Sequence, residues 1–136
     1  MGNFVDVDMV VFPIHHPGHW LVGIVSFKTK RFEIYNSWQI SNKRSDFEII
    51  EDFLKLAWSE TRPSSLPLEM DDEHGWAHEF MTCPQQDDTY ACGVFAIWFV
   101  EHLARRAAVT DVTFGRIGYF RRQAALAIAR GKLGDV

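Results

Sequence analysis

The stretch Cys83-Pro84-Gln85-Gln86-Asp87-Asp88-Thr89-Tyr90-Ala91-Cys92-Gly93 leads into a long apolar run, Val94-Phe95-Ala96-Ile97-Trp98-Phe99-Val100. The run predicts a central, buried helix over residues 92–106 that is apolar on nearly all sides before Glu101. Cys92 would lie in its first turn, where unpaired backbone N–H groups and the positive end of the helix dipole stabilise a thiolate. The stretch therefore predicts a buried helix with a reactive cysteine at its start.

Shorter apolar and aromatic runs on either side of this helix predict the rest of the fold. We expect strands at 9–14, 19–27, 31–37 and 76–82, helices at 46–60 and 116–130, and a loop over 63–75. The polar turn Lys28-Thr29-Lys30 joins the second and third strands as an antiparallel hairpin. Because strands and helices do not alternate as βαβ units, we expect an α+β fold, a mostly antiparallel small sheet packed against helices.

The two flanking helices carry local signals of their own. Ser45 and Glu48 resemble a capping box, and Phe47, Ile50 and Leu54 follow at helical spacing. In the last helix the same spacing predicts that four side chains face inward, namely Ile117, Phe120, Ala124 and Ile128. Gly131 is expected just after its end.

Composition limits the classes of partner. The 136 residues, 47% of them hydrophobic, predict one globular domain, and the net charge of −4 argues against nucleic acid, which needs a basic face. No apolar run approaches the roughly 20 residues of a membrane span, so no membrane partner is expected. The two cysteines predict free thiols in a reducing compartment, intracellular and either nuclear or cytoplasmic, rather than a Cys83–Cys92 disulfide.

Acyl transfer by a thiol needs a nucleophile, a base, an orienter for the base and donors to the oxyanion. Cys92 is the candidate nucleophile, and Gln86, six residues upstream, carries an amide that can donate to an oxyanion. His19 begins one hairpin strand and Asn36 ends the other, so the hairpin brings them side by side. With the backbone N–H of Cys92 as a second donor, the chain holds a candidate for each part and needs no cofactor.

The joint spacing of these residues resembles that of the ubiquitin-like-protein-specific cysteine peptidases, which are the SUMO (sentrin) proteases and their adenovirus-type relatives. It rests on His19-Trp20 opening a strand, Asn36-Ser37 seventeen residues on, and Pro84-Gln85-Gln86 ahead of Cys92-Gly93. The chain order His, Asn, Cys agrees with that clan and is the reverse of papain's. The segment Ile117-Gly118-Tyr119-Phe120-Arg121-Arg122 also resembles the closing helix of SUMO proteases.

The resemblance implies a papain-like cysteine protease fold and an enzyme that cleaves after the C-terminal Gly-Gly of a SUMO-like modifier or its conjugates. It implies Cys92 as nucleophile, His19 as general base and then acid, and Asn36 as orienter where SUMO proteases usually carry Asp. Gln86, which the spacing favours over Gln85, would donate to the oxyanion.

The resemblance also bears on the substrate channel and on the extent of the domain. Trp20 would wall the narrow channel for the substrate's C-terminal glycines. The family's domain has a substantial portion before its histidine, whereas eighteen residues precede His19. We therefore expect residues 1–136 to form a single peptidase-like domain that lacks this portion: a fragment, a minimal variant, or a domain whose uncovered surface is completed by a partner chain or oligomer.

Plainer interpretations compete at each position. Cys92 alone fits a small buried hydrophobe, and Asn36 fits a turn. The neighbouring histidines His15, His16 and His19 invite a metal site, but no carboxylate or cysteine is near them in sequence, so no metal is expected. Two other functions stay open, a catalytically weak or inactive protease-like binding module and an acyltransferase on the same fold.

Overall fold

The computed structural model describes residues 8–61, 73 and 75–131. One four-stranded sheet has the order β1-β2-β3-β4. Its strands are β1 (Met9–His16), β2 (His19–Ser26), β3 (Arg31–Tyr35) and β4 (Ala77–Phe80). Both β1–β2 and β2–β3 pair antiparallel, with Val22 opposite Tyr35 in the second pair. The expected hairpin and the mostly antiparallel sheet of an α+β fold are confirmed.

The fourth strand pairs differently from the other three. β4 lies parallel to β3, with Arg31 opposite Ala77 and Ile34 opposite Phe80. The helix α1 (Ser45–Thr61) connects them, because parallel neighbours need a long crossover between their ends. This βαβ unit was not predicted, since the connecting loop expected over 63–75 gives no signal of it and lies almost wholly outside the described residues.

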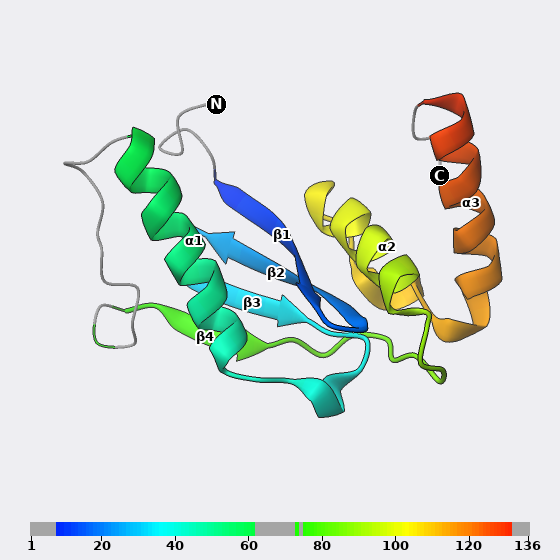
Figure 1. The fold of residues 1–136 in the computed structure, drawn as a ribbon, viewed down its shortest axis with the longest axis horizontal. Coiled ribbons are helices and arrows are strands. Elements are labelled where there is room, and N and C mark those ends of the chain that lie inside the picture. The colour runs from blue at the N-terminus through cyan, green and yellow to red at the C-terminus, as the bar shows by residue number, and fades with distance from the viewer. Residues whose placement is uncertain (1–7, 62–72, 74, 132–136) are drawn as a thin grey trace.

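Helices cover both faces of the sheet (Figure 1). On one face α1 packs through Phe47, Ile50 and Leu54, as its spacing predicts, and its first helical residue is Ser45 itself. The approach is close, because a Cβ built on Gly23 would lie 2.5 Å from Cδ1 of Ile50. On this face, apolar side chains of α1, β2 and β3 pack together in one hydrophobic core, and their burial stabilises the contact.

The second core lies under α2 (Cys92–Ala104) on the opposite face. Phe95, Trp98 and Phe99 are fully buried there, so the prediction of a central buried helix that begins at Cys92 is confirmed. The helix is not covered all round, however, because Ile97 is 51% exposed on its outer side. Among the described residues no helix combines the length and apolar character that crossing a bilayer requires.

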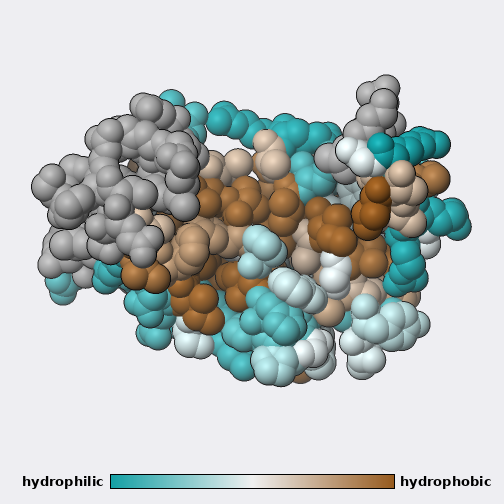
Figure 2. Space-filling model, turned by 45° about the horizontal axis from the view of Figure 1, so that its top comes forward, coloured by the Kyte–Doolittle hydropathy of each residue, from teal (hydrophilic) through white to brown (hydrophobic). Residues whose placement is uncertain are grey.

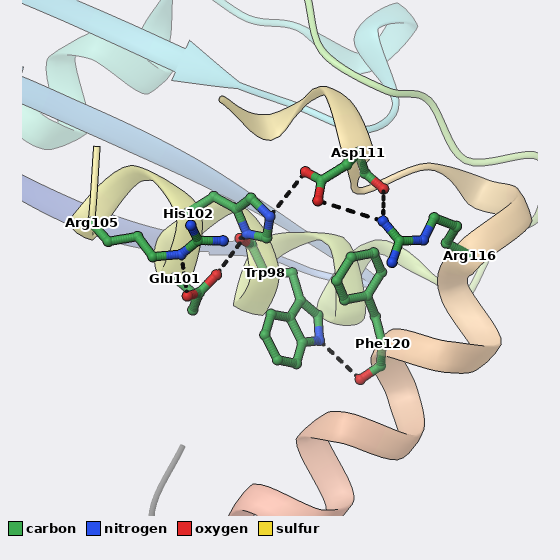
Figure 3. Close-up of polar contacts among 7 residues, drawn as sticks. All are labelled: Trp98, Glu101, His102, Arg105, Asp111, Arg116 and Phe120. Carbon is green, nitrogen blue, oxygen red and sulfur yellow. Dashed lines mark hydrogen bonds and ion pairs between the residues drawn. The ribbon is translucent and has the colours of Figure 1, made fainter. Parts of the chain in front are cut away.

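The last helix, α3 (Ile117–Arg130), docks on α2 through its first turns. Trp98 donates its indole N–H to the carbonyl oxygen of Phe120 at 2.9 Å, and both residues are buried (Figure 3). Gly131 follows in the left-handed conformation expected of a helix end, with φ 68°. The prediction for Ile128 is wrong, because that side chain is 81% exposed.

A short polar cluster ties the end of α2 to the 3-10 turn η4 (Val109–Asp111) that precedes α3 (Figure 3). The buried ring of His102 lies with Nδ1 2.7 Å from a Glu101 oxygen and Nε2 2.9 Å from Asp111 Oδ1. Neither contact is aligned as a hydrogen bond, and Nδ1 instead forms one with the carbonyl oxygen of Trp98 at 2.8 Å. Burial raises the pKa of Asp111, but its contacts with His102 and the charge of Arg116 outweigh burial and hold that pKa below its usual value.

Candidate active site

The hairpin brings the candidate base and its orienter into direct contact. His19 is the first residue of β2, and Asn36 follows the last residue of β3. His19 Nε2 and Asn36 Oδ1 lie 2.7 Å apart, and both side chains are buried. Figure 1 shows that the start of β2, the end of β3 and the start of α2 lie at one end of the sheet. Since Val22 lies opposite Tyr35, the antiparallel pairing sets Asn36 diagonal to His19, close enough for the side chains to meet.

The orientation of the Asn36 amide is set by its other partners. Its Oδ1 also accepts from the backbone N–H of Trp38 at 3.0 Å, so this atom is the oxygen. Its Nδ2 donates to Ser41 Oγ at 2.9 Å and to Asn42 Oδ1 at 2.8 Å. Because Oδ1 can only accept, His19 must carry its proton on Nε2 and donate it. The other ring nitrogen, Nδ1, is then the basic one.

The oxyanion candidate is held in place at both ends of its amide. Gln86 Oε1 accepts from the hydroxyl of Ser37 at 2.6 Å, and Gln86 Nε2 donates to the carbonyl oxygen of Asp88 at 2.9 Å. The backbone N–H of Gln86 donates to Ser37 O at 2.8 Å, which ties this loop to the end of β3. An amide nitrogen has two N–H groups, so one remains for a ligand.

The neighbouring Gln85 differs from Gln86 in this respect. Its Nε2 donates to the carbonyl oxygens of Asn36 at 2.9 Å and Cys83 at 3.1 Å, and its Oε1 accepts from the backbone N–H of Gln39 at 2.8 Å. Both of its N–H groups are therefore engaged by the protein. The preference for Gln86 as the oxyanion donor, made from spacing, has this physical support.

Cys92 is the first residue of α2 and is 6% exposed. The turn before it is fixed by Asp88, whose Oδ1 accepts from the backbone N–H groups of Tyr90 at 3.2 Å and Ala91 at 2.8 Å. The next residue, Gly93, faces β2, since a Cβ built there would lie 3.9 Å from Cδ1 of Trp20. Cys92 and His19 are thus the chain neighbours of Gly93 and Trp20, which lie close to each other.

Trp20 lines an apolar pocket of about 560 Å³. The residues that line it come from β1, β2 and α2, and they are Pro13, Trp20, Gly93, Ala96, Ile97 and Val100. The Trp20 ring is 41% exposed and packs on His15, with ring centroids 4.5 Å apart. Figure 2 shows hydrophobic side chains gathered in a band across the middle of one face of the molecule. An apolar surface of this kind suits a ligand or partner.

The second cysteine has a structural environment. The half-buried Cys83 donates its thiol to the carbonyl oxygen of Asn36 at 3.4 Å. Burial raises the pKa of this thiol to about 11, and hydrogen bonds only partly oppose the rise. Cys83 is therefore protonated at neutral pH, and both cysteines are free thiols in this structure.

The histidine next to the site is paired with a carboxylate. His16 Nε2 lies 2.5 Å from Oδ1 of the buried Asp46 at the start of α1. Within the described ranges no group of three or more His, Cys, Asp or Glu side chains is placed to hold a metal ion.

Sequence reasoning missed the side chains that support the site. Ser37, Ser41 and Asn42 hold the amides of Gln86 and Asn36, yet no periodic pattern marks them. The signal that could have found them is chemical, because a buried amide needs partners for both its oxygen and its nitrogen.

Comparisons with known proteins agree on one family. The model of the Ulp1 protease family, C-terminal catalytic domain, matches residues 1–132. Ubiquitin-like-specific protease 1A of Arabidopsis thaliana is 26% identical over 129 residues, which cover 93% of this chain and 24% of that relative.

Solved structures share the fold. The SUMO protease Ulp1 with its catalytic cysteine oxidised to a sulfenic acid superposes with a TM-score of 0.76 at 22% identity, over 98% of this chain and 57% of that one. The C-terminal Ulp1 protease domain in complex with Smt3, the yeast ortholog of SUMO, gives a TM-score of 0.69 at 21% identity, over 89% and 52%. The chain thus spans about a quarter of the curated relative's length and about half of each solved chain.

Proposed function

The chain belongs to the Ulp1 protease family, a family of cysteine peptidases, and we propose that it cleaves the acyl bond after the C-terminal Gly-Gly of a SUMO-like modifier. The observation that carries the proposal is the buried 2.7 Å contact between His19 Nε2 and Asn36 Oδ1, at the end of the sheet where the helix that begins with Cys92 starts. That contact leaves Nδ1 free to act as a base toward a thiol.

In the proposed reaction Cys92 attacks the carbonyl carbon of the last glycine. His19 takes the thiol proton on Nδ1, and the new C–S bond pushes the carbonyl electron pair onto oxygen. The free N–H of Gln86 Nε2 and the backbone N–H of Cys92 stabilise this oxyanion. When the tetrahedral intermediate collapses, the C–N bond breaks and imidazolium returns its proton to the leaving amine.

The second half of the reaction restores the enzyme. His19 removes a proton from water, and the resulting hydroxide attacks the thioester carbon. The C–S bond breaks, the modifier leaves with a free carboxylate, and the Cys92 thiolate regains a proton from His19. Asn36 acts throughout by holding Nε2–H, which fixes the ring and keeps Nδ1 toward the thiol.

The class of substrate is proposed from the family and from the surface beside the site. A solved domain of this fold is in complex with Smt3, which supports a ubiquitin-like modifier as partner. Trp20 and Gly93, the chain neighbours of His19 and Cys92, both line the apolar pocket, which supports a narrow glycine-containing substrate segment beside them. We propose that residues 1–136 act as one peptidase-like domain.

The test is release of a fluorogenic amide from the C-terminus of a panel of modifiers, including SUMO and ubiquitin. We expect turnover of at least one modifier, complete loss in Cys92→Ala and retention in the control Cys83→Ala. If no modifier is turned over above the Cys92→Ala background, the proposed function is wrong. A chain that binds a modifier tightly without turnover would be the inactive binding module instead.

A further inference from the structure

We propose that Asn42 and Ser41 are positioning residues that set the orientation of the Asn36 amide, and through it the tautomer of His19. The inference rests on the proposed function, because a defined tautomer matters only if His19 is a base. It adds residues to the site that no comparison assigns. Both lie on or just after the 3-10 turn η2 (Gln39–Ser41).

An amide that orients the histidine can face it in the wrong orientation, whereas a carboxylate cannot. Both oxygens of an aspartate accept hydrogen bonds, so either of them would serve His19 Nε2–H. An asparagine presents an acceptor on one side and a donor on the other. If the Asn36 amide turned over, Nδ2 would face His19 Nε2, the ring proton would move to Nδ1, and the base would be lost. A chain with Asn at this place needs a device that selects one orientation.

The turn after Asn36 supplies two acceptors on the donor side. Asn36 Nδ2 lies 2.9 Å from Ser41 Oγ and 2.8 Å from Asn42 Oδ1, so both of its N–H groups are used. Ser41 donates its single hydroxyl proton to the carbonyl oxygen of Trp38 at 2.7 Å and can therefore only accept from Asn36. Turning the amide would bring its oxygen against the Ser41 oxygen and break that bond, and Asn42 would keep its bond only by turning its own amide as well.

The backbone fixes the two acceptors in place. The N–H of Ser41 donates to Trp38 O, and the N–H of Asn42 donates to Gln39 O, each at 3.0 Å. On the opposite side of the amide, the N–H of Trp38 donates to Asn36 Oδ1 at 3.0 Å. The Ser41 hydroxyl and the Trp38 N–H therefore favour the same orientation of Asn36, and the Asn42 oxygen adds a further bond to it.

Asn42 is the partner whose chemistry gives a selective test. Asn42→Asp keeps an oxygen within reach of Asn36 Nδ2 in the same shape, whereas Asn42→Leu fills the space without an acceptor. In an Asn36→Asp background, residue 42 must donate a hydrogen bond to position 36 instead of accepting one. Asn42 can then turn its own amide to donate, but a carboxylate at position 42 would meet the carboxylate at 36 with like charge.

The experiment measures the tautomer and the reaction rate in the full chain. Nitrogen-15 NMR of the His19 ring distinguishes Nε2–H from Nδ1–H and does not depend on peptidase activity. The rate is that of turnover of the preferred modifier. The variants are Asn42→Leu with Ser41→Ala, Asn42→Asp, Asn36→Asp, and the double change Asn36→Asp with Asn42→Asp, each checked by thermal unfolding.

We expect the wild type and Asn42→Asp to hold Nε2–H and to turn over at similar rates. Ser41→Ala with Asn42→Leu should mix the tautomers and lower the rate about 10-fold, as expected for a donor left without a partner. Asn36→Asp with Asn42→Asp should fall at least about 10-fold below the product of the single effects. A wild-type ring with Nδ1–H, or a Ser41→Ala, Asn42→Leu variant that keeps pure Nε2–H, would overturn the inference. So would an Asn42→Asp variant as impaired as Ser41→Ala with Asn42→Leu. A wild type with no turnover but with these tautomer changes would instead count against the proposed function alone.

Discussion

Replacing Gln86 by alanine removes the side-chain oxyanion donor and tests the geometry of the site most sharply. The change deletes the Nε2 group, of which one N–H is engaged by Asp88 O at 2.9 Å and the other is proposed to face the substrate. It also removes the acceptor of the buried Ser37 hydroxyl, at 2.6 Å. Transition-state stabilisation and protein stability should therefore both fall, and they can be measured separately.

The two losses have different sizes. Loss of one oxyanion donor lowers kcat by about 10²–10³, which corresponds to roughly 2.7–4 kcal/mol of transition-state free energy. Leaving the Ser37 hydroxyl and the Asp88 carbonyl without a partner costs about 1–3 kcal/mol of unfolding free energy. For a domain of this size that loss lowers Tm by several degrees.

The matched control is Gln85→Ala. Gln85 holds three backbone groups with both N–H groups and its oxygen, so its removal destabilises the loop to a comparable extent. Since it has no N–H left for a substrate, we expect kcat to fall less than about 10-fold. The assay is steady-state release of a fluorogenic amide, with thermal unfolding of each variant. Equal losses of kcat in Gln85→Ala and Gln86→Ala would refute the assignment of Gln86.

Three further changes test the supporting structure. Ser37→Ala frees the oxygen of Gln86 and should lower kcat about 10-fold with little change in KM, measured in the same assay; an unchanged kcat would contradict the role of this hydroxyl. Trp98→Phe removes the buried indole donor to Phe120 O and should cost about 1–3 kcal/mol of unfolding free energy in urea titrations, so a loss below about 0.5 kcal/mol would argue against the docking of α3. The folded-state pKa of Asp111 is depressed, so its contribution to stability is full above the unfolded pKa of about 4 and is lost as pH falls through the folded pKa. Asp111→Asn should accordingly lower the free energy of unfolding at pH 6 and make that free energy fall less steeply below about pH 4. If the free energy of unfolding depends on pH with the same slope in both proteins, Asp111 makes no such contribution.

The parts of the fold set by local sequence were predictable. The alternation of residues 31–37 and the turn at Lys28-Thr29-Lys30 define a hairpin, and a hairpin fixes which residues meet across it. Because Val22 lies opposite Tyr35, Asn36 lies diagonal to His19 rather than opposite it, and their contact also depends on the reach of the two side chains. The start of α2 at Cys92 agrees with the apolar run over residues 91–100, which is longer than the roughly four to eight residues of a buried strand.

The parts that depend on distant elements were not predictable. Helical spacing indicates that Ile97 and Ile128 share faces with buried residues, but it cannot say whether another element covers them, and both are exposed. The parallel pairing of β4 depends on how a long connection returns to the sheet. The partners of the Asn36 amide lie five and six residues on in an irregular turn, where no periodicity points at them.

The proposed reaction depends most on Cys92 as the nucleophile and on His19 as the base that activates it. The most direct measurement is intact-mass and peptide-mapping analysis after exposure to a ubiquitin-like modifier with a C-terminal electrophile. We predict one adduct per chain, on Cys92, formed by Cys83→Ala at the wild-type rate and suppressed in His19→Ala. An adduct on Cys83 would contradict the assignment of Cys92, and a Cys92 adduct that forms at an unchanged rate in His19→Ala would contradict the assignment of His19.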